Sequence, residues 1–304
     1  QKTAYAMTWC LVGSEICIID RSKTTQQWGF CPLDFGGFNI VIEIVSSANP
    51  KFKLAMKLHE RRGRQQQQKI LIDGIREVRY AMQSGIEIET LFVSNSVLAE
   101  QIEHVTELVN STAGSAFYLA QDLFDRLSYG QRNSQVIAIA KTPKRSLDHL
   151  QINSPAFLVV VEGIEKPGNL GAIARTVDAV GADGMILVDC VTEAFNPNAI
   201  RASMGTVLSR RVVASSSDRL MPWLKTNHIT SYAAWVDDSQ SYHQADFRES
   251  IAIVLGSEAK GLSRQWTGES IKKISLPMRG TADSLNVSTT AAVLLYEVWR
   301  QRQF

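Results

Sequence analysis

The sequence is poor in the features that most directly reveal a function. Its four cysteines form no C-x-x-C pair and none lies at zinc-ligand spacing with histidine, so no metal site is expected. Scattered thiols without a signal peptide predict a reducing, cytoplasmic environment. No segment approaches the roughly 18 consecutive apolar residues that a membrane-spanning helix needs. These absences exclude a disulfide scaffold, a zinc module and a membrane protein as working hypotheses.

An excess of charge of one sign is also missing. The net charge is +2, so the whole chain does not demand an acidic partner such as a nucleic acid. The charge is unevenly placed, however. Residues 50–80 hold nine lysines and arginines against three acids, so this segment carries +6 and the remainder carries −4. A local basic surface is therefore predicted.

The length and the hydrophobic pattern predict two α/β units. A chain of 304 residues corresponds to about two domains, and a hydrophobic content of 45% is enough for two cores. From residue 49 onward, short apolar strands alternate with helices. The expected organisation is an N-terminal extension of unknown role (1–44), a small α/β sandwich (45–140), a polar linker (141–155) and a parallel-sheet α/β domain (156–304).

The expected elements of the first unit are a basic helix 51–62, strand 70–72, helix 75–84, strand 88–94, helix 97–110, strand 116–119, helix 121–127 and strand 135–140. Those of the second are strand 157–161, helix 169–180, strand 184–188, helix 197–204, strand 211–214, helix 217–226, strands 229–236, 251–255 and 271–276, and helix 284–302.

Three polar or glycine-containing turns follow predicted strands of the second unit. The first, 163–176, contains glycines but no G-x-G-x-x-G fingerprint, which disfavours a nucleotide-dependent oxidoreductase. Taken alone, this segment is best interpreted as an ordinary strand-to-helix turn. Arg175 taken alone is best interpreted as a surface residue that forms an ion pair. The carboxyl ends of parallel strands are nevertheless where ligands bind, and an arginine there presents fixed donors to a phosphate or an oxyanion.

The other two turns are 256–262 and 275–288. In the first, Gly256 and Gly261 flank Glu258, and glycines allow a ligand to approach the backbone closely. The alternative is a tight turn with a solvated glutamate. In the second, Ser284 is the expected N-cap of the last helix, and the alternative is a capped helix after a polar loop. Together the three turns predict a small-molecule site built from loops.

The motifs within these turns resemble those of a known family. Asn-Leu-Gly-Ala-Ile-x-Arg-Thr from residue 169, Gly-Ser-Glu-x-x-Gly-Leu from residue 256, and Leu-Pro-Met at 276–278 followed by Leu-Asn-Val-Ser at 285–288 occur in that order. They resemble the three motifs of the SpoU (TrmH-like) branch of SPOUT RNA methyltransferases. The resemblance covers residues 49–303 and leaves 1–44 outside. One departure is Glu165-Lys166 before Pro167, where the family commonly has an acid directly before proline.

The resemblance implies a fold, a reaction and a cofactor. The fold is a parallel-sheet α/β domain with a trefoil knot, a rare exception to unknotted topology, preceded by a ribosomal-protein-like sandwich that binds the substrate. The reaction is S-adenosylmethionine-dependent 2′-O-methylation of a ribose in RNA, with ribosomal RNA favoured and transfer RNA as the alternative. The family forms homodimers, and its chemistry needs no metal.

The resemblance also implies residue roles. Arg175 corresponds to the catalytic arginine, Asn169 and Glu258 shape the site, and Asn286 orients the neighbouring loops. Cofactor contacts correspond to Gly256, Leu276, Met278, Ser284 and Leu285. The basic segment gains an RNA-binding interpretation, with the residues Lys53, Lys57, Arg61, Arg62 and Arg64; its alternative is a solvated helix face. The competing function is a non-catalytic RNA-binding or assembly factor on the same fold.

Overall fold

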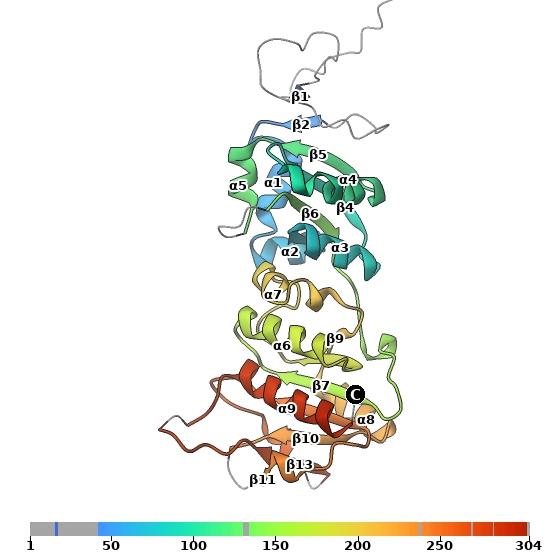
Figure 1. Ribbon diagram of the computed structural model, residues 1–304, viewed down its shortest axis with the longest axis vertical. Coiled ribbons are helices and arrows are strands. Elements are labelled where there is room, and N and C mark those ends of the chain that lie inside the picture. Colours follow the sequence, from blue (N-terminus) through green and yellow to red (C-terminus); the bar gives the residue numbers. More distant parts are fainter. Residues whose placement is uncertain are drawn as a thin grey trace, which may run out of the picture.

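The computed structural model describes residues 16–17, 42–129, 134–236, 239–268, 270–281 and 283–302. Most of the segment 1–44, and with it the question of its role, lies outside these residues. Two α/β units are stacked along the long axis of the molecule (Figure 1). Within the described ranges, no helix has both the length and the apolar character required to cross a membrane.

The N-terminal domain is a six-stranded mixed sheet with helices on both faces, and its strand order is β1-β2-β5-β4-β6-β3. Buried residues of α1 and α5 pack on one face, and those of α3 and α4 pack on the other. The elements are β1 (Ile16–Cys17), β2 (Ile42–Ile44), α1 (Pro50–Lys57), α2 (Arg61–Gln67), β3 (Lys69–Asp73), α3 (Ile75–Gln83), β4 (Ile88–Ser94), η1 (Ala99–Gln101), α4 (Ile102–Ser111), β5 (Ser115–Leu119), α5 (Gln121–Leu127) and β6 (Val136–Lys141).

The C-terminal domain is a seven-stranded sheet with order β11-β13-β10-β12-β7-β8-β9, and every pairing in it is parallel. Buried residues of α6, α7 and α9 pack on one face, and α8 covers the other. The elements are η2 (Leu147–His149), β7 (Phe157–Glu162), α6 (Pro167–Ala179), β8 (Gly184–Val188), α7 (Pro197–Ala202), η3 (Thr206–Leu208), β9 (Val212–Ser215), α8 (Ser217–Thr226), β10 (Thr230–Ala234), β11 (Gln240–Ser241), η4 (Tyr242–Gln244), β12 (Ile251–Leu255), η5 (Arg264–Thr267), β13 (Ile271–Ser275) and α9 (Val287–Gln301).

The central strands of this sheet are continuous apolar runs because both of their faces are covered. All residues of β7, β8 and β12 are buried, as a parallel sheet between helical layers requires. The carboxyl ends of β7, β10, β12 and β13 meet at one edge, and the start of α9 returns to the same edge. This convergence places the three motif turns side by side.

Two expectations about helices were wrong. The helix expected at 51–62 is divided into α1 and α2, because Arg64 folds back and donates to the carbonyl oxygens of Leu58 and His59 at 2.9 and 2.8 Å. The last helix begins at Val287, and its N-cap is Asn286 rather than Ser284. The Asn286 carboxamide oxygen accepts from the backbone N–H of Ser288 at 2.9 Å, so the cap falls two residues later than expected.

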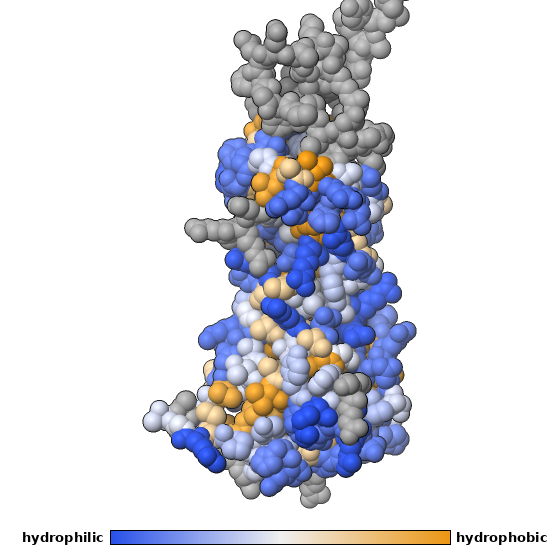
Figure 2. Space-filling model, viewed as in Figure 1, coloured by the Kyte–Doolittle hydropathy of each residue, from blue (hydrophilic) through white to orange (hydrophobic). Residues whose placement is uncertain are grey.

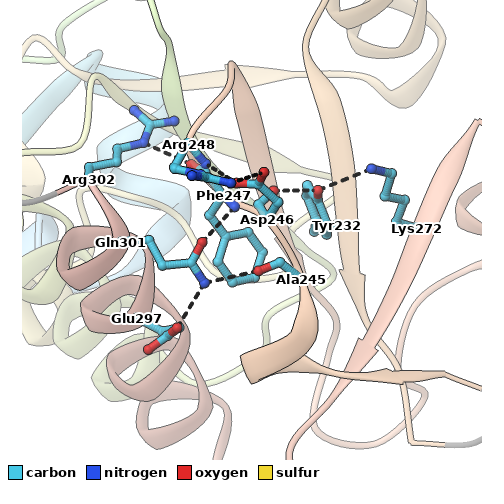
Figure 3. Close-up of polar contacts among 9 residues, drawn as sticks. All are labelled: Tyr232, Ala245, Asp246, Phe247, Arg248, Lys272, Glu297, Gln301 and Arg302. Carbon is cyan, nitrogen blue, oxygen red and sulfur yellow. Dashed lines mark hydrogen bonds and ion pairs between the residues drawn. The ribbon is translucent and has the colours of Figure 1, made fainter.

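Side-chain contacts also fix the carboxyl end of α9 (Figure 3). Gln301 accepts from the backbone N–H of Phe247 at 2.8 Å and donates to the carbonyl oxygen of Ala245 at 2.9 Å. Arg302 donates from Nε to the carbonyl oxygen of Phe247 at 3.0 Å, and burial lowers the pKa of its guanidinium. With Asn286 capping the other end, α9 is held at both termini against the sheet.

The two domains are joined by polar and apolar contacts. The largest core cluster contains residues of both domains. Across the junction, both Nε and a terminal nitrogen of Arg64 donate to one carboxylate oxygen of Glu193, at 2.9 and 2.6 Å. The expected linker is not free-standing, because Leu147 within it is buried in the C-terminal core.

Candidate active site

A pocket of about 590 Å³ opens at the carboxyl edge of the C-terminal sheet. Its walls come from the ends of β10, β12 and β13, from the 276–286 segment and from the first turn of α9. All five residues expected to contact a cofactor line it, namely Gly256, Leu276, Met278, Ser284 and Leu285. The size and position are typical of a small-molecule site in an open α/β sheet.

One wall of the pocket is a turn that requires glycine. Ser257 and Gly261 exchange two backbone hydrogen bonds, at 3.1 and 3.0 Å, so the chain doubles back tightly after β12. A Cβ atom at Gly256 would lie 2.4 Å from the carbonyl carbon of Gly261, which no side chain tolerates. Gly261 itself adopts a φ of +64°. The turn therefore presents backbone, rather than side chains, to a ligand.

Apolar side chains form the opening of the pocket. Met278 and Leu285 are each 39% exposed, and Val236 is 69% exposed. Large apolar groups that face solvent beside a pocket are typical of a binding surface. Backbone polar groups on one side and exposed apolar groups on the other match a cofactor that combines a purine ring with an amino-acid tail.

The three polar residues expected to shape the site form one chain of contacts. Asn169, in the first turn of α6, donates its carboxamide N–H to a carboxylate oxygen of Glu258. Its carbonyl oxygen accepts from Asn286 Nδ2 at 3.3 Å. Each residue comes from a different motif turn, so the contacts tie the three turns together. Glu258 and Asn286 line the pocket, and Asn169 lies behind them.

Arg175 lies on α6, six residues after Asn169, and does not line the pocket. Its side chain is exposed. It forms no hydrogen bond or ion pair with any residue that the structure describes, so its donors face solvent near the site. The alternative interpretation, in which Arg175 forms an ordinary surface ion pair, is therefore not supported by any acidic partner among the described residues.

The residues expected to bind RNA divide into two groups. Lys53, Lys57 and Arg62 are exposed on α1 and α2. Arg61 is also exposed, but it donates to the carbonyl oxygen of Val191 at 3.0 Å. Arg64 is only 5% exposed and is engaged at the domain junction, so the expectation that it contacts RNA was wrong.

Several residues of the pocket wall were not among the expected site residues, and Lys166 and Trp235 are two of them. Lys166 lies directly before α6 and lines the pocket, and its signal was the departure from the family pattern noted before Pro167. Trp235 follows β10, and the ammonium of Lys273 lies 5.1 Å from its ring centroid. No motif marked it. In the described part of the chain, no group of three or more His, Cys, Asp or Glu side chains could hold a metal ion.

Two family models match this chain. The model of the SpoU rRNA Methylase family matches residues 156–296, and that of the MRM3-like substrate binding domain matches residues 49–138. A 23S rRNA (guanosine-2′-O-)-methyltransferase, RlmB of Bordetella pertussis, is 30% identical over 75% of this chain and 94% of its own.

Two further relatives extend the match over more of the chain. RlmP of Bacillus subtilis, a 23S rRNA (guanosine(2553)-2′-O)-methyltransferase, is 27% identical over 84% of this chain and 98% of its own. The crystal structure of the SpoU methyltransferase AviRb from Streptomyces viridochromogenes, in complex with AdoMet, superposes with a TM-score of 0.76. It is 26% identical and covers 84% of this chain and 98% of its own.

Proposed function

Because the chain belongs to the SpoU rRNA methylase family, we propose that it catalyses S-adenosylmethionine-dependent 2′-O-methylation of a ribose in RNA, with ribosomal RNA as the substrate. The observation that carries the proposal is the chain of contacts from Asn286 through Asn169 to Glu258 beside the pocket. This chain of contacts links the pocket to α6, the helix that also carries the exposed Arg175. A cytoplasmic location is part of the proposal, and the trefoil knot remains a prediction from the family.

The pocket residues suit the cofactor and would hold it mainly through backbone. Gly256 and Leu276 would offer backbone groups, and Met278 and Leu285 would cover apolar faces. Ser284 would add a hydroxyl group. S-adenosylmethionine supplies the methyl group of the reaction.

Arg175 is proposed as the catalytic residue. A guanidinium group stays protonated in proteins, so it is a poor general base and a strong donor. We assign it to the phosphate beside the target ribose and to the oxyanion that develops at the 2′-oxygen. Asn169, Glu258 and Asn286 would keep the surrounding loops in register, so that the hydroxyl and the methyl group are aligned.

Replacing Arg175 tests this assignment. Arg175→Ala is expected to lower methyl transfer to RNA by about 100-fold, the effect of removing one oxyanion donor. S-adenosylhomocysteine binding, measured by calorimetry, should persist because Arg175 does not line the pocket. Arg219→Ala is the matched control, since Arg219 is exposed on α8 across the sheet. Full activity of Arg175→Ala would exclude the catalytic assignment.

The N-terminal domain is proposed to bind the RNA. Lys53, Lys57, Arg61 and Arg62 present positive charge that can follow a phosphate backbone, which raises affinity more than sequence selectivity. Mapping 2′-O-methyl sites in cellular RNA with and without the gene distinguishes ribosomal from transfer RNA. A non-catalytic assembly factor would bind RNA without binding S-adenosylmethionine.

A homodimer is proposed on the basis of the family and of α9. Tyr296 is 50% exposed and Trp299 is 38% exposed on this helix, with ring centroids 6.2 Å apart. Figure 2 shows hydrophobic surface over the first part of α9. Sedimentation should give the mass of two chains, and Trp299→Glu should shift it toward one. A monomer mass that does not change with concentration contradicts the proposal.

A further inference from the structure

A buried carboxylate with no role in the proposed reaction lies at the carboxyl end of β7, beside the strand β12 whose last residue lines the pocket. Glu162 is the last residue of β7 and is 6% exposed. The neighbouring strand β12 ends at Leu255, which is in register with Val161. Glu162 therefore lies next to the point where the chain leaves β12. We call residues 256–266, which begin there, the cofactor loop.

The four hydrogen bonds that the described residues make to Glu162 all come from this one loop. Its Oε2 accepts from the backbone N–H of Ser263 at 2.7 Å, and its Oε1 accepts from the Ser263 hydroxyl at 2.9 Å. Oε1 also accepts from the indole N–H of Trp266 at 3.1 Å and from the side-chain amide of Gln265. Among the described residues, no lysine or arginine forms an ion pair with it. A single carboxylate thus accepts hydrogen bonds from uncharged donors of three residues.

The energetics favour a positional role over general stabilisation. Burying a carboxylate is unfavourable unless its oxygens are hydrogen-bonded, and a well-packed apolar side chain would stabilise the fold at least as well. An apolar side chain would not, however, fix the direction of the loop. The fully buried ring of Trp266 and the hydroxyl of Ser263 are held in one geometry only because both face the same carboxylate.

The two ends of the cofactor loop have different tasks. Its first residues, Gly256 to Glu258, line the pocket, and Glu258 accepts from Asn169. Its last residues, Ser263 to Trp266, bind Glu162. We propose that Glu162 is a positioning residue that fixes the cofactor loop and thereby sets the shape of the pocket. This inference rests on the proposed function insofar as it assigns the pocket to S-adenosylmethionine.

The test compares Glu162→Gln with a matched buried carboxylate. Glu162→Gln replaces one carboxylate oxygen by an N–H₂ group. This group cannot accept a hydrogen bond, so at least one donor of the loop loses its acceptor. Asp183→Asn is the control, because Asp183 is 7% exposed and accepts from the backbone N–H of Phe157 at 2.7 Å, at the opposite end of β7. Both variants should lose stability through an unpaired buried donor. Only Glu162→Gln should weaken S-adenosylhomocysteine binding, by about tenfold in calorimetry.

A kinetic and an exchange measurement separate positioning from simple destabilisation. In Glu162→Gln the KM for S-adenosylmethionine should rise while kcat at saturating cofactor stays close to that of the unchanged protein. Amide hydrogen exchange without cofactor should increase within 256–266 and not elsewhere in the sheet. Ser263→Ala, which removes one exposed hydroxyl donor, gives a milder variant should Glu162→Gln fail to fold, and its exchange should rise in the same segment.

The outcomes are distinct. Equal cofactor affinity and equal loop exchange in the Glu162→Gln and Asp183→Asn variants overturn the positioning role. Failure of the unchanged protein to bind S-adenosylhomocysteine instead rejects the proposed function, and the exchange measurement then decides the role of Glu162 by itself.

Discussion

His59 lies at the turn between α1 and α2, and its surroundings favour the neutral imidazole. Burial lowers its pKa from 6.5, although its hydrogen bond to the carbonyl oxygen of Leu127 at 3.0 Å acts in the opposite direction. The ring also stacks on Tyr129, with centroids 5.3 Å apart. The unfolded chain therefore binds more protons than the folded chain once the pH falls below 6.5.

The stabilisation by neutral His59 is fully present above its unfolded pKa and is lost as the pH falls through its folded pKa. We expect the urea midpoint of the unchanged protein to fall more steeply than that of His59→Gln between about pH 7.5 and pH 5. Chemical denaturation at several pH values measures this difference. Parallel pH dependence of the two proteins would show that His59 does not couple protonation to folding.

Side-chain environment is the part of the site that the sequence could not supply. Position after parallel strands was enough to predict that the three motif turns form one site, and the family resemblance pointed to Asn169, Glu258 and Asn286 within it. Neither was enough to separate Arg62 from Arg64, which are two positions apart in one basic segment. Arg64 is buried because Glu193, 129 residues away, lies opposite it, and a contact of this kind has no local signature.

At the scale of elements, well-patterned strands and helices were the most predictable, and β4, α5 and α8 have their expected bounds. The expected bounds of β8 and β12 agree with the structure because both strands are apolar throughout and end at glycine or polar turns. The short strands β1, β2 and β11 were missed, since two or three residues carry no period. The division between α1 and α2 was missed because the side-chain hydrogen bonds of Arg64 to carbonyl oxygens five and six residues earlier leave no mark in the hydrophobic pattern.

The start of α9 gives a prediction at this scale. Asn286 caps the helix through Oδ1 and donates to Asn169 through Nδ2, so the two tasks can be separated. Asn286→Ala should lower stability by about 1 kcal/mol, the usual effect of losing an N-cap. Asn286→Asp retains the capping oxygen and loses the donor, so its thermal midpoint should be preserved while its methyl-transfer rate falls.

Ser284→Ala is the comparison for the cap itself. Ser284 lies before the cap, so its removal should leave the thermal midpoint unchanged, whereas a loss equal to that of Asn286→Ala would return the cap to Ser284. Undiminished methyl transfer by Asn286→Asp would mean that the contact with Asn169 is dispensable for the reaction.

At the scale of the whole molecule, the junction between the domains determines how they behave together. A core cluster common to both domains and the ion pair between buried Arg64 and partly exposed Glu193 oppose independent motion (Figure 1). A substrate-binding surface that is rigidly joined to the pocket would present the RNA ribose at a fixed distance from the methyl donor. Within α2, Arg64 faces inward and Arg62 faces solvent, so one segment would serve both the junction and the proposed RNA surface.

Paired substitutions within α2 separate these two purposes. Arg64→Ala removes the hydrogen bonds of Arg64 to Glu193 and leaves that partly exposed carboxylate with Arg61 at 3.4 Å, so the free energy of unfolding should fall by about 2 kcal/mol. The substitution should also separate the unfolding transitions of the two domains, as followed by fluorescence and circular dichroism.

Arg62→Ala should leave stability unchanged, weaken RNA binding for all sequences and reduce the salt dependence of that binding. If Arg62→Ala bound RNA with unaltered affinity, α2 would not belong to the RNA-binding surface. If Arg64→Ala were as stable as the unchanged protein, the ion pair of Arg64 with Glu193 would not hold the domains together. The apolar contacts between the domains would then have to fix the distance from the proposed RNA-binding surface to the pocket.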